Sequence, residues 1–533
     1  MEKSHADFLS FIHTSTKRSS ELVKGNLHAA FLERRFMVKL TDIVENLEYS
    51  LYPESTELSS LSVSDIAYNS ANAGMGILFV CLIGARADGH DFAAEAYRRG
   101  SRIFVCQKKL SLPADAVQLI TENTRRALAV LSAAFFGHPE RKLAMIGVTG
   151  TKGKSTVCEM IYHILTKNGI RAGSVGTIGV KYGSEQYPTG NTTPESYELF
   201  RIFSEMAAHG VEAAVIEVSS QGIKLDRVFG ISFFAAVMTN LSEDHIGLDE
   251  HPDFEDYKRC KMELFRRCRY GIFNADDPYF NEFSSACTGF VRTYSVTEDA
   301  DWSADSIVPY RTAKEFGVTF TVRHEGKQIE GTLPLPGMFS VSNALAAMSA
   351  AALLGVPPES SVPALMDVSL RGRFEIVQTP LENVTFLIDF AHNGDSLARA
   401  LVSLRAYHPA RLICLFGSVG GRTQIRRREL GLAAAEYADF TILTSDNPDK
   451  ESPYDIIHDI EKNMPGASYI AIPDRKEAIE YAVKNAAYGD IVLIAGKGHE
   501  AYQLIDGKKL PFSERDIIQN AAALVRRSVE INI

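Results

Sequence analysis

The sequence predicts an α/β protein of three domains, on the strength of three observations. The chain has 533 residues, more than one hydrophobic core organises, and its length suggests about three to four domains. Short apolar runs alternate with amphipathic segments, a pattern typical of parallel sheets covered by helices. Breaks in this pattern near residues 140 and 370 divide the chain into 1–140, 141–370 and 371–533.

The first domain is expected to open with helices in residues 1–60, where Leu and Phe recur at loose helical spacing. A tighter strand and helix rhythm follows, and Gly137-His138-Pro139 ends its last helix. The predicted elements are strand Ile77–Leu82, helix Phe92–Arg99, strand Arg102–Cys106 and helix Thr124–Phe136.

The second and third domains continue the alternation. Gly317–Leu335 alternates apolar and polar residues, which predicts antiparallel strands, and Asn343–Leu354 reads as a buried helix. In the second domain we predict strand Ala144–Val148, helix Ser155–Asn168, and strands Ala213–Val218, Phe234–Thr239 and Gly271–Asn274. In the third we predict strands Val384–Asp389, Leu412–Phe416, Phe440–Thr444, Ser468–Ile472 and Ile491–Ala495.

Composition excludes several classes of protein. Hydrophobic residues make up 45% and charged residues 23%, which argues against a disordered chain, a collagen-like chain or a membrane bundle. A net charge of −10 makes the chain a poor general binder of nucleic acid. No run reaches the roughly 18 apolar residues of a membrane span, and the polar start has no signal-peptide core. We therefore expect a cytoplasmic, monomeric protein with small-molecule partners, whose seven cysteines are buried free thiols.

A glycine-rich loop predicts a nucleotide site. Gly147–Thr156 reads GVTGTKGKST between an apolar strand and a helix, so backbone N–H groups and the helix dipole favour phosphate there. Lys154 would reach the β- and γ-phosphates of ATP, and Ser155 would bind Mg²⁺. The strict spacing of such loops is not met, because Val148 occupies the position of the first glycine. The nucleotide-binding candidates of the loop are Gly150, Thr151, Gly153, Lys154, Ser155 and Thr156.

This loop resembles that of the Mur ligase superfamily of ATP-dependent, amide-forming enzymes. Further segments resemble the family's motifs in the same order, over about residues 65–516. They are Asn191–Pro194, Glu217–Ser220, Thr239–His245, Tyr257-x-x-x-Lys261, Asn274–Asp277, Gly337-x-Phe339, Asn343–Ala347, Gly372–Glu375 and Asp389–His392.

The resemblance implies an architecture and a chemistry. An N-terminal α/β domain would bind the UDP substrate, a central P-loop ATPase-like domain would bind ATP, and a C-terminal Rossmann-like domain would bind the incoming amino acid. ATP would phosphorylate a carboxylate, and an amine would then attack the acyl phosphate. It implies Lys154, Lys261 and His245 as catalytic residues, a carbamylated Lys261, and two Mg²⁺ ions held by Ser155, Glu217, His245 and Lys261. It also assigns Asn343, Arg373 and Asp389 to the nucleotide.

Within the superfamily, the chain is most similar to the ligases that add the third amino acid to UDP-N-acetylmuramoyl-L-alanyl-D-glutamate in peptidoglycan synthesis. Asp446–Pro448, Gly496–Glu500 and Phe512–Arg515 match motifs of these ligases, whereas Asn69-Ser70-Ala71 replaces the usual Asp-Ser-Arg and Gln221 a histidine. The implied substrate-binding residues are Ser70, Thr192, Thr193, Ser219, Arg227, Asp446, Asn447, Asp449, Gly496 and Glu500.

The added amino acid is expected to be L-lysine. Members that add meso-diaminopimelate have an arginine after Asp-Asn-Pro to bind its distal carboxylate, and this chain has Asp449 there. Lys450 or Arg422 could substitute for that arginine, so diaminopimelate stays as the alternative, with ornithine also open. The motifs also leave open a Mur-like ligase that acts on a different acid, such as a folyl ligase, and a catalytically silent nucleotide-binding scaffold.

Overall fold

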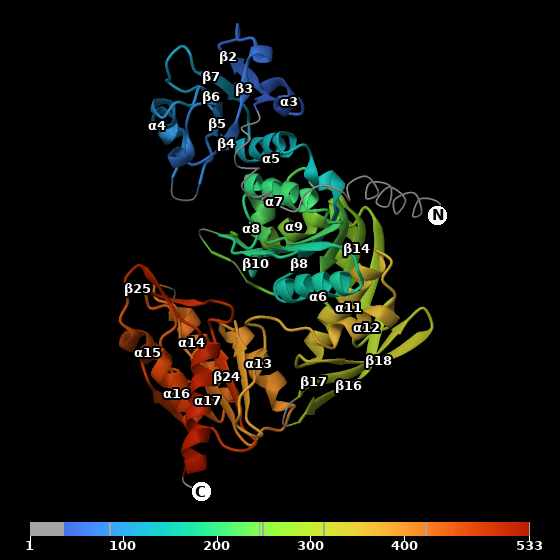
Figure 1. The fold of residues 1–533 in the computed structure, drawn as a ribbon, viewed down its shortest axis with the longest axis vertical. Coiled ribbons are helices and arrows are strands. Elements are labelled where there is room, and N and C mark those ends of the chain that lie inside the picture. Colours follow the sequence, from blue (N-terminus) through green and yellow to red (C-terminus); the bar gives the residue numbers. More distant parts are fainter. Residues whose placement is uncertain are drawn as a thin grey trace. The chain divides into compact units, whose positions relative to one another are not determined.

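A computed structural model describes residues 37–84, 87–244, 246–247, 250–312, 315–421 and 424–531. The chain divides into two compact units, one up to Thr293 and one from Tyr294 (Figure 1). Each unit is described by itself. The helices expected before residue 37 lie outside the described residues.

The first sheet of the first unit has five strands in the order β2-β7-β6-β5-β4. All neighbours are parallel except β2 and β7. The prediction of alternating strands and helices is confirmed here, but the short strands β4 and β7 are not predicted. The prediction of helices over residues 1–60 is wrong at Ser50–Tyr52, which forms β2 by pairing with β7. The elements are β1 (Val38–Lys39), α3 (Leu40–Val44), β2 (Ser50–Tyr52), β3 (Ser62–Val63), β4 (Asp65–Ala67), β5 (Ile77–Val80), α4 (Ala93–Arg98), β6 (Ile103–Cys106), β7 (Val117–Ile120) and α5 (Thr124–Phe135).

The second sheet of this unit has the parallel order β9-β12-β8-β13-β14. The central strand β8 has later strands on both sides, so the connections diverge at its carboxyl end, where ligands bind in such sheets. The elements are β8 (Ala144–Thr149), α6 (Lys154–Lys167), β9 (Ala172–Gly176), β10 (Gly179–Tyr182), β11 (Glu185–Tyr187), α7 (Ser196–Ala208), β12 (Ala213–Glu217), α8 (Ser220–Lys224), β13 (Phe233–Met238), α9 (Phe254–Met262), β14 (Cys268–Asn274) and α10 (Phe280–Ala286).

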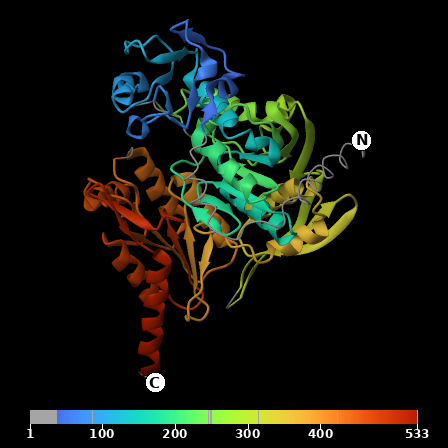
Figure 2. The same cartoon turned by 45° about the horizontal axis from the view of Figure 1, so that its top comes forward.

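The second unit begins with the antiparallel strands expected from the alternating segment, packed with two helices. Its larger sheet has the order β19-β20-β24-β21-β22-β23, parallel except at β19 (orange to red in Figures 1 and 2). The first group is β15 (Phe290–Ser295), β16 (Trp302–Arg311), β17 (Phe316–His324), β18 (Lys327–Leu333), α11 (Met338–Ala352) and α12 (Pro358–Leu365). The second is β19 (Glu375–Val377), β20 (Thr385–Asp389), α13 (Gly394–Arg405), β21 (Leu412–Phe416), α14 (Gln424–Tyr437), β22 (Phe440–Leu443), α15 (Pro453–Glu461), β23 (Tyr469–Ala471), α16 (Arg475–Asn485), β24 (Ile491–Ala495), β25 (Tyr502–Ile505), β26 (Lys508–Pro511) and α17 (Glu514–Ile531).

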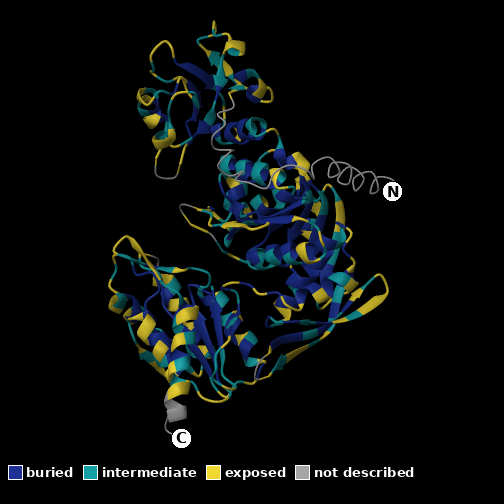
Figure 3. Ribbon diagram, in the orientation of Figure 1, coloured by how far each residue is buried: buried dark blue, intermediate teal, exposed yellow. Residues whose placement is uncertain are grey.

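Burial follows the predicted layers. The central strands of both large sheets are buried along their length, and the exposed residues gather on helices and turns (Figure 3). All seven cysteines lie in the described residues and are free thiols, five of them buried and Cys260 and Cys287 partly exposed. Within the described part of the chain, no helix has the length and apolar character that crossing a membrane requires.

Candidate active site

The glycine-rich loop connects β8 to α6, as the sequence predicts. Gly150 has a φ of +146°, and a Cβ atom added to it would lie 1.9 Å from the Thr239 hydroxyl oxygen. Only glycine therefore fits this position, where the loop crosses the end of β13. Gly153 caps the N-terminus of α6, and Ser155 is buried in the first turn of that helix.

The loop is fixed by hydrogen bonds to the segment after β13. The N–H of Thr151 donates to the Asn240 carbonyl oxygen at 2.8 Å, and the N–H of Lys152 donates to the Asn240 side chain at 3.0 Å. The hydroxyls of Thr151 and Tyr257 lie 3.0 Å apart, and the ammonium of Lys152 pairs with Asp244 at 3.0 Å. These contacts hold the backbone of the loop in one conformation.

Lys154 and Lys261 meet at one carbonyl. Lys154 Nζ donates to the Gly150 oxygen at 2.9 Å, and Lys261 Nζ donates to the same oxygen at 2.8 Å. Lys261 lies on α9 and is 2% exposed, with Nζ 4.5 Å from the centre of the Tyr257 ring. Burial, and then the charge of Lys154, hold the pKa of Lys261 well below its usual range. Lys261 is therefore suited to exist as a neutral amine, unlike the solvated lysine that its basic sequence neighbours suggest.

Glu217 lies at the same edge of the sheet as the loop. It ends β12, opposite Val148 of β8, and is 2% exposed. Its carboxylate accepts from the N–H of Thr177 at 2.8 Å and from the Thr177 hydroxyl at 3.2 Å. A carboxylate here and the hydroxyl of Ser155, on the helix that follows the neighbouring strand β8, are oxygen ligands of the kind Mg²⁺ prefers. His245, the other ligand expected from the sequence, lies outside the described residues.

Four of the predicted substrate residues surround Glu217. The Thr193 hydroxyl donates to the Glu217 carbonyl oxygen at 2.8 Å and lies 3.0 Å from the Ser219 hydroxyl. The Thr192 hydroxyl lies 3.0 Å from the Thr177 hydroxyl, which donates to the Glu217 carboxylate. The Arg227 guanidinium donates to the Thr193 carbonyl oxygen at 2.9 Å. The structure therefore brings Thr192, Thr193, Ser219 and Arg227 to the sheet edge that carries Glu217.

Ser70 lies elsewhere, in a 3₁₀ turn (Ser70–Asn72) between β4 and β5 of the five-stranded sheet. Its hydroxyl donates to Glu95 at 3.2 Å, and the same carboxylate accepts from Arg99 Nε at 2.9 Å. The Asn69 side chain accepts the N–H of Ala71 and closes a 3₁₀ turn. The sequence Asn69-Ser70-Ala71 thus forms an ordered turn beside a charged pair, in the domain expected to bind the UDP group.

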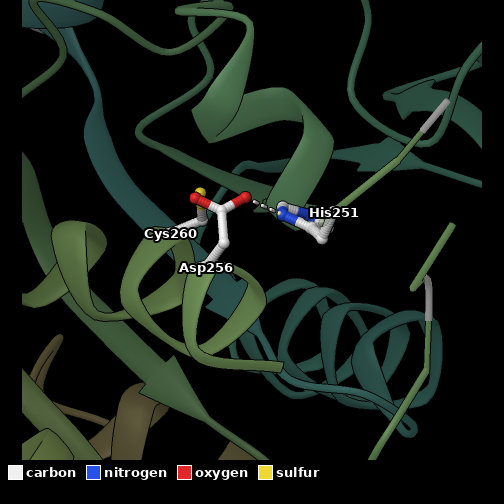
Figure 4. A group of neighbouring side chains, drawn as sticks. All are labelled: His251, Asp256 and Cys260. Carbon is white, nitrogen blue, oxygen red and sulfur yellow. Dashed lines mark hydrogen bonds and ion pairs between the residues drawn. The ribbon is translucent and has the colours of Figure 1, made fainter. Parts of the chain in front are cut away.

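His251, Asp256 and Cys260 form a cluster that the sequence pattern does not predict (Figure 4). Their ligand atoms all lie within 4.8 Å of one another, and His251 Nδ1 lies 2.8 Å from Asp256 Oδ2. Asp256 also accepts from Lys224 at 2.9 Å and from Arg259 at 2.7 Å, which lowers its pKa.

Two cations therefore already neutralise the carboxylate of this cluster, so it is poorly suited to hold a metal. Burial lowers the pKa of His251, which keeps the imidazole neutral. Since Asp256 and Cys260 lie on α9, the cluster anchors the helix that carries Lys261. A histidine five residues before an aspartate carries no sequence signal for this role.

In the second unit, Arg373 and Asp389 are neighbours. Asp389 ends β20, and its two carboxylate oxygens accept the N–H groups of Phe374 and Ala391, each at 2.8 Å. Burial raises the pKa of Asp389, and the charge of Arg373 opposes that shift. Asn343 lies on a different element, buried in α11.

The Phe512–Arg515 motif reaches this segment through Arg515. Arg515 Nε donates to the Glu375 carboxylate at 2.8 Å, and the N–H of Gly372 donates to the other oxygen of that carboxylate at 2.5 Å. The motif is thus tied to the start of the third predicted domain.

Four predicted amino-acid-binding residues gather around a buried lysine. Lys497 is 0% exposed and donates to Asn447 at 2.9 Å and to Glu500 at 3.1 Å, with Asp446 Oδ1 at 3.5 Å. Gly496 has a φ of +111°, which favours glycine, and a Cβ atom there would also lie 2.7 Å from Asp446 Oδ2. Lys497 belongs to the Gly496–Glu500 motif, but the sequence alone does not show that its side chain lies at the centre of this group.

Asp449 has a partner that the sequence does not reveal. Its carboxylate accepts the N–H of Gly507 at 2.7 Å, in the turn between β25 and β26. Its own N–H donates to the Leu504 carbonyl oxygen at 2.9 Å. The carboxylate therefore stabilises the hairpin turn, a structural role that needs no ligand.

Comparison with known proteins identifies the family. Residues 62–136 match the Mur ligase family catalytic domain, residues 148–351 the Mur ligase middle domain, and residues 372–498 the Mur ligase glutamate ligase domain. Two curated relatives are named UDP-N-acetylmuramoyl-L-alanyl-D-glutamate–2,6-diaminopimelate ligase. One, from Clostridium perfringens, is 36% identical over 90% of this chain and 98% of its own length. The other, from Caldanaerobacter subterraneus subsp. tengcongensis, is 37% identical over 91% of this chain and 99% of its own length.

A solved structure of a ligase with the same name covers 92% of this chain and 100% of its own, with a TM-score of 0.67 and 26% identity. The three matched domains follow the order expected from the sequence, and the phosphate loop, Glu217 and Lys261 occupy one edge of a sheet in the middle one. The chain therefore belongs to the Mur ligase family of ATP-dependent amide ligases.

Proposed function

We propose that this enzyme joins meso-diaminopimelate to the D-glutamate γ-carboxylate of UDP-N-acetylmuramoyl-L-alanyl-D-glutamate, with conversion of ATP to ADP and phosphate, in peptidoglycan synthesis. The observation that carries the choice of amino acid is that relatives named for this reaction align over at least 98% of their length. The monomeric state and the cytoplasmic location expected from the sequence belong to the same proposal.

The residues of the first unit fit the phosphoryl-transfer step. Lys154 now donates to the loop carbonyls of Gly150 and Thr151, and the same ammonium would turn to the γ-phosphate. Ser155, Glu217 and His245 would hold Mg²⁺, which supplies positive charge for the transferring phosphoryl group. Thr192, Thr193, Ser219 and Arg227 would hold the acid substrate beside them.

Lys261 is proposed to be carbamylated. Its neutral amine would form a bond to the carbon of CO₂ and release one proton, which changes an uncharged group into an anion. Burial and the neighbouring Lys154 charge favour the required neutral amine. The carbamate would then help to hold the second Mg²⁺.

The carbamate is testable by two measurements. Protein equilibrated with ¹³C-bicarbonate should show a carbamate resonance by NMR that Lys261→Ala lacks. Lys261→Ala should be nearly inactive, and acetate should partly restore its activity by occupying the vacated anion site. A free ammonium at Lys261 in the active protein would refute the modification.

Two observations favour diaminopimelate over lysine as the added amino acid. The relatives are named for diaminopimelate, and Asp449, the residue that suggested lysine, is engaged by Gly507. Lys450 follows Asp449 on an exposed position and is the described candidate for the distal carboxylate, while Arg422 lies outside the described residues. Side-by-side kcat/KM values for diaminopimelate, lysine and ornithine decide the amino acid.

The reaction class has its own test. Phosphate release from ATP should require both the UDP-muramoyl dipeptide and the amino acid. Release with a different acid substrate would indicate another Mur-like ligase, and the absence of any release would indicate a nucleotide-binding scaffold.

A further inference from the structure

A buried ion pair in the second unit has no role in the site described so far. Arg475 opens α16, Glu514 opens α17, and their side chains are 0% and 2% exposed. Arg475 Nε donates to Glu514 Oε1 at 2.7 Å. Glu514 is also the centre of the Phe512–Arg515 motif, for which the sequence suggests no chemistry.

The other two nitrogens of the guanidinium contact backbone next to the amino-acid pocket. Nη1 donates to the Ser445 carbonyl oxygen at 3.0 Å, and Nη2 donates to the Ala495 carbonyl oxygen at 2.7 Å. Ser445 directly precedes Asp446, and Ala495 directly precedes Gly496. One side chain therefore binds both loops that supply the pocket.

These loops follow strands that are not neighbours. Ser445 follows β22 and Ala495 ends β24, and β21 lies between the two strands in the sheet. Ladder hydrogen bonds thus do not join the two loops directly. The guanidinium spans them, and its planar fork of donors serves three acceptors at fixed angles, which a lysine ammonium does not.

A contribution to stability alone explains the pair poorly. Apolar residues of similar volume often replace a buried ion pair without loss of stability. In addition, Glu514 Oε2 is buried without a hydrogen-bond partner among the described residues, which costs free energy. The ion pair thus costs some free energy of folding, while Arg475 fixes the positions of the loops that begin at Ser445 and Ala495.

We propose that Arg475 is a positioning residue for the incoming amino acid, and that Glu514 orients its guanidinium. By binding the Ser445 and Ala495 carbonyls, Arg475 sets the spacing between the Asp446–Asn447 loop and the Gly496–Glu500 loop. This inference rests on the proposed function, because it assumes that the amino acid binds between these loops.

The test compares Arg475→Lys with a matched control, Arg411→Lys. Arg411 also pairs with a buried acid, Asp490, and donates to a backbone carbonyl, but it lies at the opposite ends of β21 and β24. Arg475→Lys keeps the charge and loses the fork. It should raise KM for diaminopimelate at least about tenfold, which corresponds to about 1.4 kcal/mol, and leave KM for ATP unchanged. Arg411→Lys should change neither constant.

A partial reaction separates this inference from the proposed function. Exchange of labelled ADP into ATP with the UDP-muramoyl dipeptide, without amino acid, reports acyl-phosphate formation. Wild-type protein without exchange would contradict the proposed function, whereas Arg475→Lys should exchange at the wild-type rate. Lost exchange, or an unchanged KM for the amino acid with a lowered Tm, would overturn the positioning role.

Glu514→Gln serves as the second variant, in case Arg475→Lys does not fold. Glutamine keeps an oxygen that accepts from Arg475 Nε and removes the charge. The same selective rise in KM for the amino acid is expected, smaller than in Arg475→Lys because the two carbonyl contacts remain. An unchanged KM in a folded Glu514→Gln protein would contradict the orienting role of Glu514.

Discussion

Lys154 and Lys261 donate to the same atom, the carbonyl oxygen of Gly150, at 2.9 and 2.8 Å. Two amino groups that share one acceptor lie close enough for the charge of one to disfavour protonation of the other. The lysine of the phosphate loop thereby helps to keep Lys261 neutral, the form that reacts with CO₂. The nucleotide contact proposed for Lys154 and the modification proposed for Lys261 would consequently be linked through one carbonyl.

Lys154→Ala should lower turnover by about 10²–10³-fold or more, because it removes a fixed positive charge at the γ-phosphate. The protein should stay folded, since the loop keeps its hydrogen bonds to Asn240. Lys167→Ala, in the exposed last turn of the same helix, is the matched control and should retain activity. Near-normal phosphate release by folded Lys154→Ala would refute the phosphate-loop assignment.

Lys261 should make stability depend on pH in CO₂-free buffer. Its pKa is lowered from 10.5 in the folded state, so the unfolded chain binds the additional proton between the two pKa values. The free energy of unfolding should therefore rise with pH across that interval and show no further contribution above 10.5. Urea unfolding at several pH values measures this slope, which Lys261→Met should lack. Equal slopes for the two proteins would contradict the lowered pKa.

Glu217→Gln should raise the Mg²⁺ concentration required for half-maximal phosphate release, because an amide is a weaker ligand than a carboxylate. The Gln side chain still offers an oxygen to the N–H of Thr177, so the fold should persist. The control is Glu212→Gln, just before the start of the same strand, where the carboxylate pairs with Arg171. An unchanged Mg²⁺ dependence in Glu217→Gln would exclude Glu217 as a metal ligand.

Asp449→Ala should leave the preference for amino acids unchanged, because its carboxylate binds the Gly507 N–H. It should lower the free energy of unfolding by about 0.5–1.5 kcal/mol through the lost hydrogen bond. Lys450→Ala should instead lower kcat/KM for diaminopimelate about 10- to 100-fold and spare lysine, as loss of a charge-assisted hydrogen bond predicts. A switch of preference in Asp449→Ala would restore the charge argument for lysine.

The sequence predicts the buried layers of the fold well, because strands such as β8, β12 and β24 are uninterrupted apolar runs followed by turn signals. It misses the hairpins β10–β11 and β25–β26, whose strands have only three or four residues each and, in β11 and β26, are mostly polar or exposed. Such strands form through pairing with their neighbours, which a local pattern does not encode.

In the candidate site, too, the sequence predicts the locally encoded features and misses those that depend on distant contacts. The glycine loop is local, and its glycines and the Gly-Lys-Ser-Thr run between a strand and a helix predict it. The burial of Lys261, by contrast, involves a contact with Gly150, 111 residues away. Asp449 binds Gly507, 58 residues away along the chain, so the sequence does not reveal this partner and the Asp449 carboxylate is interpreted as a contact for the amino acid. Arg475 reads as a surface residue at a helix start, and only the fold shows what its guanidinium binds.

The contacts of residues 514 and 515 also set an order of events during synthesis. Glu514 pairs with a residue 39 positions earlier, and Arg515 pairs with Glu375, 140 positions earlier. Domains fold as units while the chain emerges from the ribosome, the N-terminal ones first. The nucleotide loop can therefore form on a nascent chain, but Arg475 stays an unpaired charge until residue 514 has been translated. A chain still attached to its ribosome before that point would have the proposed phosphate site, but the two loops of the proposed amino-acid pocket would lack the link through Arg475 and Glu514.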